Sequence, residues 1–182
     1  NGGNFRTYDP STEKFSSGSV IFEKNPGIPV DSLDNIIQDN LGDIWFISVS
    51  KGVFHYISEK DSIVHLKSEP GNAASISSNS ISSVIRENDS SVWLISNYGI
   101  LEKLDPSTHK VIYHSLKLKH DYDQWMEFKM YIDKEEDIWI SARNNAIGAY
   151  LFKSSSLEYI HYHAGSAVHK LNNNIVTAIV ED

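Results

Sequence analysis

Seven residues in expected turns carry side chains of the kinds that bind sugars. They combine cationic groups, amides and aromatic rings, which hydrogen-bond to hydroxyl groups or stack on a sugar ring. They are Lys51, Asn97, Tyr98, Tyr122, Trp125, Arg143 and Asn144. Trp125 differs from the other tryptophans because it lies off the repeat described below, beside Tyr122, Asp123 and Gln124. The set predicts a ligand-binding site, with an oligosaccharide as the hypothesis.

Two other groups have metal-ligating side chains, and a structural interpretation is favoured for both. His161 and His163 share one face of a strand because they lie two residues apart. No third ligand is evident, however, and zinc sites usually need three or four. The acidic turn over residues 133–137 lacks the alternating ligands and central glycine of an EF-hand. It contains Asp133, Glu135, Glu136 and Asp137. The sequence therefore predicts no metal and no cofactor.

Catalytic patterns are missing from the sequence. It contains no Gly-X-Ser-X-Gly nucleophile turn and no His-Glu-X-X-His metal motif. Acidic residues are plentiful, but none stands at an inner position that breaks the repeat and would require chemistry. We expect this fragment not to be an enzyme.

Composition narrows the class of partner. The formal net charge of -8 argues against a nucleic-acid surface, because phosphate binding requires a net basic field. The chain has no cysteine, so it has neither disulfides nor thiolate metal sites. No apolar run approaches the ~20 residues of a membrane helix. We therefore expect no nucleic-acid partner and no membrane contact by this fragment.

A repeat of about 48 residues organises the chain. Trp45 and Trp93 lie 48 residues apart, and Trp93 and Trp139 lie 46 apart. Asp-Pro-Ser-Thr turns begin at Asp9 and Asp105, 96 residues apart. A period of 40–50 residues with several short strands in each unit is typical of β-propeller blades. The sequence predicts an all-β partial propeller of four-stranded antiparallel blades.

The repeat also sets the expected boundaries within a single propeller domain. Residues 1–29 are the second half of a blade, and residues 164–182 are the start of another. Three complete blades cover residues 30–69, 70–116 and 117–163. Ser19–Glu23 is the expected outer strand of the first, incomplete blade, and Ile175–Asp182 is the expected first strand of the last one. The three repeated tryptophans should lie on second strands, between neighbouring sheets.

The repeat resembles the two-component regulator propeller repeat. The resemblance rests on the strand Ile81–Glu87, on Trp93 and Gly99, and on Asp105-Pro106, and much of it recurs between Asp39 and Gly52. It implies the periplasmic sensor region of a Bacteroidetes-type hybrid two-component system, within an inner-membrane protein. It further implies a second propeller in series, a histidine kinase beyond the membrane, and recognition of polysaccharide breakdown products.

Two alternative functions stay open at this stage. The strand pattern around the tryptophans also resembles that of virginiamycin-lyase propellers, which are enzymes. A scaffold that binds another protein through its rim is the second alternative. Separately, a partial propeller leaves sheet faces without a neighbour, and apolar faces of this kind favour association. We therefore expect homodimers or less regular self-association of the isolated chain.

Overall fold

The computed structural model describes residues 6–17, 19–29, 32–115, 118, 125–143 and 146–181. These residues form three four-stranded antiparallel sheets, one hairpin and one short helix. The hairpin pairs β1 (Arg6–Asp9) with β2 (Lys14–Ser17), and α1 covers Ser19–Lys24. The first sheet contains β3 (Leu33–Gln38), β4 (Ile44–Ser48), β5 (Gly52–Ile57) and β6 (Ser62–Leu66). The second contains β7 (Ile81–Asn88), β8 (Ser91–Ser96), β9 (Leu101–Asp105) and β10 (Lys110–His114). The third contains β11 (Phe128–Ile132), β12 (Ile138–Ala142), β13 (Ala149–Lys153) and β14 (Glu158–Tyr162).

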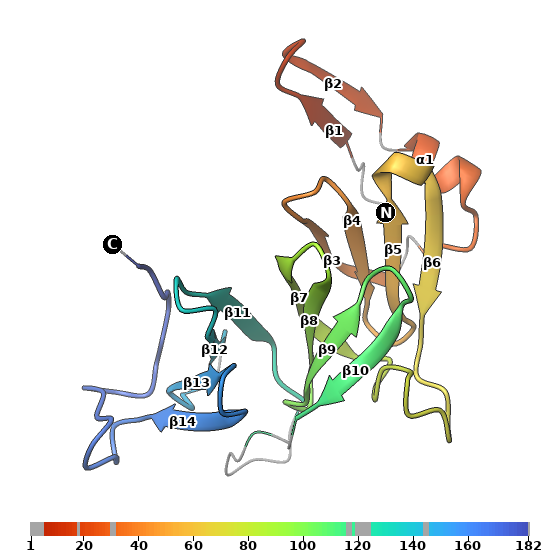
Figure 1. Ribbon diagram of the computed structural model, residues 1–182. Coiled ribbons are helices and arrows are strands. Elements are labelled where there is room, and N and C mark those ends of the chain that lie inside the picture. Colours follow the sequence, from red (N-terminus) through yellow and green to blue (C-terminus); the bar gives the residue numbers. More distant parts are fainter. Residues whose placement is uncertain are drawn as a thin grey trace.

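Each sheet is an up-and-down meander in which the strands pair in chain order. The three sheets lie side by side as successive propeller blades, and the hairpin projects from one end (Figure 1). The predicted all-β partial propeller is confirmed. A 3-10 turn at Ser58–Lys60 connects β5 to β6. No helix in the described part of the chain is long and apolar enough to cross a membrane.

In the first and second sheets, the second strand is the most buried part. Every residue of β4 and of β8 is buried, which explains why these segments are apolar without alternation. Trp45 and Trp93 are 0% and 1% exposed, as predicted for positions between sheets. Trp139, on β12, is only half-buried, because no further described sheet packs on its side. The repeated tryptophan therefore has its full packing environment in two of the three blades.

In the first and third sheets, an acidic residue just after the first strand supports the tryptophan of the next strand. Asp39 Oδ2 accepts a 2.9 Å hydrogen bond from Trp45 Nε1, and Asp133 Oδ2 accepts one of the same length from Trp139 Nε1. The other carboxylate oxygen of Asp133 accepts the backbone N–H groups of Glu135 and Asp137. The acidic turn at residues 133–137 therefore has a structural role within its blade.

Contacts between blades are apolar in the core and polar where the first strands meet. Trp93, Phe128 and Phe152 belong to one buried cluster shared by the second and third sheets. Trp45 and Val92 belong to another, shared by the first and second sheets. Between β7 and β11, the Ser82 hydroxyl accepts the Phe128 N–H at 2.5 Å and donates to the Phe128 carbonyl at 3.1 Å. This small side chain lets the two strands approach closely.

The expected outer strand at Ser19–Glu23 is wrong. The strand that pairs with β1 is β2, which begins five residues earlier, and residues 19–24 form helix α1. Ile21 and Phe22 of this helix pack against a cluster containing Phe46 and Phe54, on the face of the first sheet that points away from the second. Burial of this apolar pair outweighs the weak strand preference of so short a segment.

The expected last strand has no regular secondary structure among the described residues 175–181. Glu181 nevertheless accepts a 3.1 Å hydrogen bond from Tyr131 of β11, so this segment lies beside a first strand. The segmentation of the chain into blades and part-blades stays a prediction. Self-association also stays a prediction, and α1 packs on the far side of the first sheet.

Candidate ligand-binding face and a buried ion network

The turns between second and third strands meet the connections between blades. Asn97 N–H donates to Ser80 O, Met126 N–H donates to Asn97 O, and Arg143 N–H donates to Glu127 O, all at 2.8–2.9 Å. Antiparallel strands place these two kinds of loop at the same end of every sheet. Those predicted site residues that the structure describes therefore lie on one end of the molecule, which we call the loop face.

Trp125 is half exposed on the loop face and fixed at its edge. Its side chain is 50% exposed, and its Nε1–H donates a 3.1 Å hydrogen bond to Ser80 Oγ. Ser80 Oγ in turn donates to Asn97 Oδ1 at 3.1 Å, and Asn97 Nδ2 donates to Met126 O at 2.7 Å. Because the polar edge of the indole is bonded inside the protein, the exposed part of the ring is a rigid apolar surface.

Asn97 is 2% exposed, and both ends of its amide bond to the protein. It therefore supports Trp125 and has no free group for a ligand. The neighbouring Tyr98 is 43% exposed. The sequence showed both residues in one turn, but could not separate the buried residue from the exposed one.

Arg143 adds charge to the loop face, although much of that charge is balanced. Its Nη1 lies 2.7 Å from Glu127 Oε1, and its side chain is 58% exposed. This pairing raises the pKa of Arg143, with a smaller contribution from Asp34 on β3. Arg143 follows the second strand of the third sheet, whereas Lys51 lies in the turn between β4 and β5 of the first sheet. The loop face therefore includes groups from nonadjacent blades.

The remaining predicted site residues contribute less. Lys51 is exposed in the turn between β4 and β5, and its backbone O lies 2.6 Å from His65 Nε2. Tyr122 and Asn144 lie outside the described residues. Elsewhere, the rings of His161 and His163 are 4.5 Å apart, and His161 Nε2 contacts Ile147 O at 2.6 Å. One nitrogen of this pair is therefore already used within its own blade.

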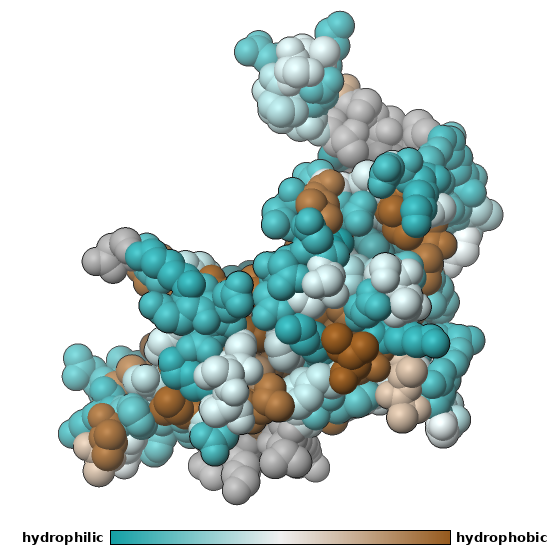
Figure 2. All heavy atoms as spheres, viewed as in Figure 1, coloured by the Kyte–Doolittle hydropathy of each residue, from teal (hydrophilic) through white to brown (hydrophobic). Residues whose placement is uncertain are grey.

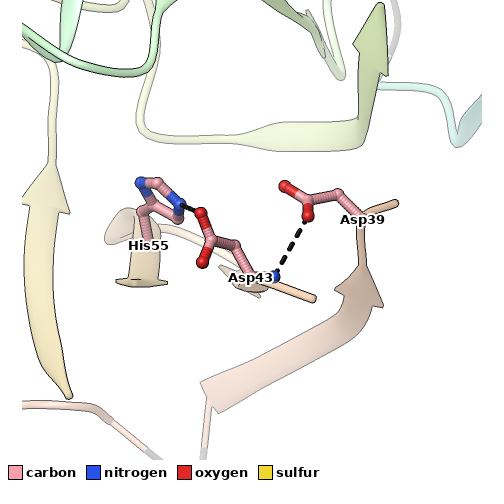
Figure 3. A group of neighbouring side chains, drawn as sticks. All are labelled: Asp39, Asp43 and His55. Carbon is pink, nitrogen blue, oxygen red and sulfur yellow. Dashed lines mark hydrogen bonds and ion pairs between the residues drawn. The ribbon is translucent and has the colours of Figure 1, made fainter. Parts of the chain in front are cut away.

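A buried ion network lies at the opposite end, between the first and second sheets. Figure 3 shows Asp39 and Asp43 at the two ends of one turn, with His55 approaching Asp43 from β5. His55 Nε2 is 3.1 Å from Asp43 Oδ2. Arg86 of β7 places Nε 2.7 Å from Asp39 Oδ2 and Nη2 3.4 Å from Asp43 Oδ2. The four side chains connect two blades.

Asp39, Asp43 and His55 carry metal-ligating atoms within 4.8 Å of one another. The cation between these two carboxylates, however, is the Arg86 guanidinium, whose side chain is 3% exposed. A divalent ion would have to displace a charge that already forms two ion pairs in a low-dielectric site. The arrangement therefore favours a structural network that holds the second blade to the first.

His55 makes the stability of this network depend on pH. Burial lowers the pKa of His55 to about 4 from an ordinary 6.5, despite the opposing effect of Asp43. As pH falls below 6.5, the unfolded chain binds a proton at this histidine before the folded protein does. We expect about 3 kcal/mol of unfolding free energy to be lost between pH 6.5 and 4 through this residue.

Urea denaturation at several pH values checks this expectation. His55→Gln keeps a donor for Asp43 but does not titrate, so its stability should fall less over the same range. His163→Gln, outside the network, should follow the original protein. Equal acid sensitivity in the original protein and His55→Gln would contradict the assignment.

Glu102 was missed by the sequence interpretation, which found no acidic residue at an inner position that breaks the repeat. It is fully buried on β9, at the position that Phe54 and Tyr150 occupy in the other sheets. Alignment of the third strands against the repeat would have revealed a carboxylate in an aromatic position.

Comparison with known proteins extends these observations. No protein-family model matches the sequence, and no curated protein does either. Among solved structures, the fold resembles the extracellular domain of a protein from B. thetaiotaomicron that is named as a one-component system. The TM-score is 0.63 with 19% identity, over 100% of this chain and 23% of that one. An extracellular domain named as belonging to a hybrid two-component system of that organism gives 0.63 with 15% identity, over 88% and 22%.

The fold is also shared with an enzyme. Virginiamycin B lyase from Staphylococcus aureus gives a TM-score of 0.58 with 9% identity, over 91% of this chain and 50% of that one. This chain spans less than a quarter of the two B. thetaiotaomicron domains it matches. At these identities the likeness establishes the fold. The chain therefore has the propeller fold found in extracellular domains of bacterial one- and two-component systems.

Proposed function

We propose that this chain is part of an extracytoplasmic, ligand-sensing propeller of a hybrid two-component system, and that its loop face contacts an oligosaccharide. The observation that carries the proposal is Trp125, a half-exposed ring whose polar edge is fixed by Ser80. A rigid aromatic face stacks on a sugar ring at little entropic cost. Tyr98 supplies a hydroxyl group on the same face, and Arg143 a guanidinium.

The surroundings of the site fit a sensor. Similar folds occur in extracellular domains of bacterial one- and two-component systems, which supports a binding role over a catalytic one. The proposal places the complete protein in the inner membrane, with this propeller in the periplasm. The rest of the propeller and a second propeller would then complete the ligand site, and homodimers would transmit the signal.

Calorimetry tests the proposal on the complete extracytoplasmic domain, using a panel of plant and host oligosaccharides. Trp125→Ala should weaken binding of a recognised oligosaccharide by at least about tenfold, equivalent to roughly 1.4 kcal/mol. Arg143→Ala should weaken it less, because Glu127 already balances its charge. Leu157→Ala, which removes an exposed side chain from the turn between β13 and β14, is the matched control. Unchanged affinity in both Trp125→Ala and Arg143→Ala would remove this face from the site.

A further inference from the structure

A histidine on each fourth strand contacts a nearby backbone carbonyl group. These residues are His65, His114 and His161. Their Nε2 atoms lie 2.6, 3.0 and 2.6 Å from carbonyl oxygens. The oxygens belong respectively to Lys51, Ala73 and Ile147. In the first and third sheets the carbonyl belongs to the turn between the second and third strands, and in the second sheet it belongs to the connection between blades, so we call this histidine a loop clamp.

The residue across the strand from the clamp differs in the second sheet. Phe54 stacks on His65 with ring centroids 4.1 Å apart, and Tyr150 stacks on His161 at 4.0 Å. The partner of His114 is Glu102 instead. An aromatic ring holds the histidine without any charge, so the fold itself does not require a carboxylate here.

Glu102 connects three segments from a fully buried position. Its Oε1 lies 2.7 Å from His114 Nδ1 and accepts the Ser77 N–H at 2.8 Å. Its Oε2 is buried and has no hydrogen-bond partner among the described residues. A buried carboxylate oxygen without a partner is costly, so Glu102 is a less stable choice at this position than an aromatic ring.

The two contacts of His114 require a defined number of protons on the His114–Glu102 pair. Both ring nitrogens face oxygen atoms, so both contacts form only if two protons are shared with Glu102. They can sit on the imidazolium, or one on the imidazole Nε2 and one on the carboxyl group. If one of these two protons is lost, a histidine nitrogen without a proton faces an oxygen without a proton. This happens either between Nδ1 and Glu102 or between Nε2 and the Ala73 carbonyl group. One of the two contacts must then break.

We propose that Glu102 and His114 form a proton-dependent latch on the connection 69–80, closed at low pH and released as pH rises. The latch holds this connection at Ala73 and at Ser77. The connection ends at Ser80, the residue that fixes the edge of Trp125. An effect of the latch on ligand binding at Trp125 rests on the proposed function, whereas the latch itself does not.

The groups around Glu102 also favour a latch that is closed when the pair is protonated and opens as pH rises. Among the described residues, His114 is the titratable side chain in contact with Glu102, β8 places Leu94 opposite it, and the connection presents Ser77. Glu69 of the same connection accepts its hydrogen bond from Asn72. Burial raises the pKa of Glu102. The folded protein therefore keeps a proton that the unfolded chain has lost, and this stabilisation disappears as pH rises above about 4.5 and through the folded pKa.

Hydrogen exchange measured without any sugar tests the latch on the complete chain. Protection factors, which correct for the intrinsic pH dependence of exchange, are compared for the amides of residues 73–77 at pH 6 and pH 9. Protection in the original protein should fall by at least about tenfold, the effect of one pKa unit. The amides of β12 report global opening and serve as the reference.

Two variants make the test specific. In Glu102→Gln an amide nitrogen that donates to His114 Nδ1 cannot also accept the Ser77 N–H, so protection of Ser77 should be lower than in the original protein at pH 6. Glu102→Phe restores the stacking that the first sheet uses at this position, so its protection should not depend on pH. A change below twofold in the original protein would overturn the latch. The same pH dependence in Glu102→Phe as in the original protein would overturn it too.

Discussion

Replacing Arg86 by alanine is expected to lower the free energy of unfolding by about 3–5 kcal/mol, the cost of leaving buried charges without their partner. The side chains of Asp39 and Asp43 are 2% and 14% exposed, and Arg86 contacts both. Burial alone would raise the pKa of Asp39, but hydrogen bonds from Trp45 and Arg86 hold it below its usual value. Without the guanidinium, that balance is lost. Urea denaturation at pH 7 measures the effect.

Two further variants show whether geometry or charge is responsible. Arg86→Lys keeps the charge but cannot bond both carboxylates as a planar fork does, so an intermediate loss is expected. Lys24→Ala breaks an ion pair with Asp61 in which both side chains are about half exposed. This control should cost at most about 1 kcal/mol. If Arg86→Ala costs no more than Lys24→Ala, the network does not hold the blades together.

Replacing Trp93 by alanine is expected to cost about 3–5 kcal/mol, the usual range for truncating a large buried aromatic side chain. Trp93 is 1% exposed, and Phe152 from the third sheet meets it edge-on at 5.4 Å. Lys103 lies over its ring at 5.0 Å. The variant therefore opens a cavity between two sheets, which neither sheet can fill alone. Thermal and urea denaturation both measure the loss.

Trp139→Ala is the matched control for Trp93→Ala. It occupies the same repeat position, but its ring is only half-buried and contacts Tyr162 of its own sheet at 5.2 Å. We expect a clearly smaller loss of stability than for Trp93→Ala. Equal losses would mean that the tryptophan stabilises its own blade rather than the contact between blades.

The period of the tryptophans predicted the three sheets and the place of each tryptophan in them, because a repeat transfers every position from one blade to the next. The same repeat also predicts the position of strand β2 in the first hairpin. Lys110 begins the strand five residues after Asp105, and Lys14 begins β2 five residues after Asp9. The apolar run at residues 20–22 favours a strand at the wrong place. Only the packing of α1 on the first sheet, a tertiary contact, decides its conformation.

Contacts between blades could not be predicted in the same way. Arg86 and Asp39 lie 47 residues apart, and a repeat does not tell which side chains meet across an interface. Burial was equally hidden within turns, where Asn97 points inward and Tyr98 outward. The residue types at the candidate site were readable from the sequence. Their division into supporting residues and exposed residues required the structure.

Helix α1 makes the two outer sides of the three-sheet array different, because it packs on the first sheet and no helix packs on the described part of the third. It seals one side of the first sheet with Ile21 and Phe22, while its outward residues Glu23 and Lys24 are exposed. Head-to-tail stacking needs two different, complementary open surfaces, and repeated stacking of this kind builds filaments. A pair formed through the open face of the third sheet would instead be isologous, with the two copies related by a two-fold axis. Association of this chain is therefore expected to stop at an isologous pair.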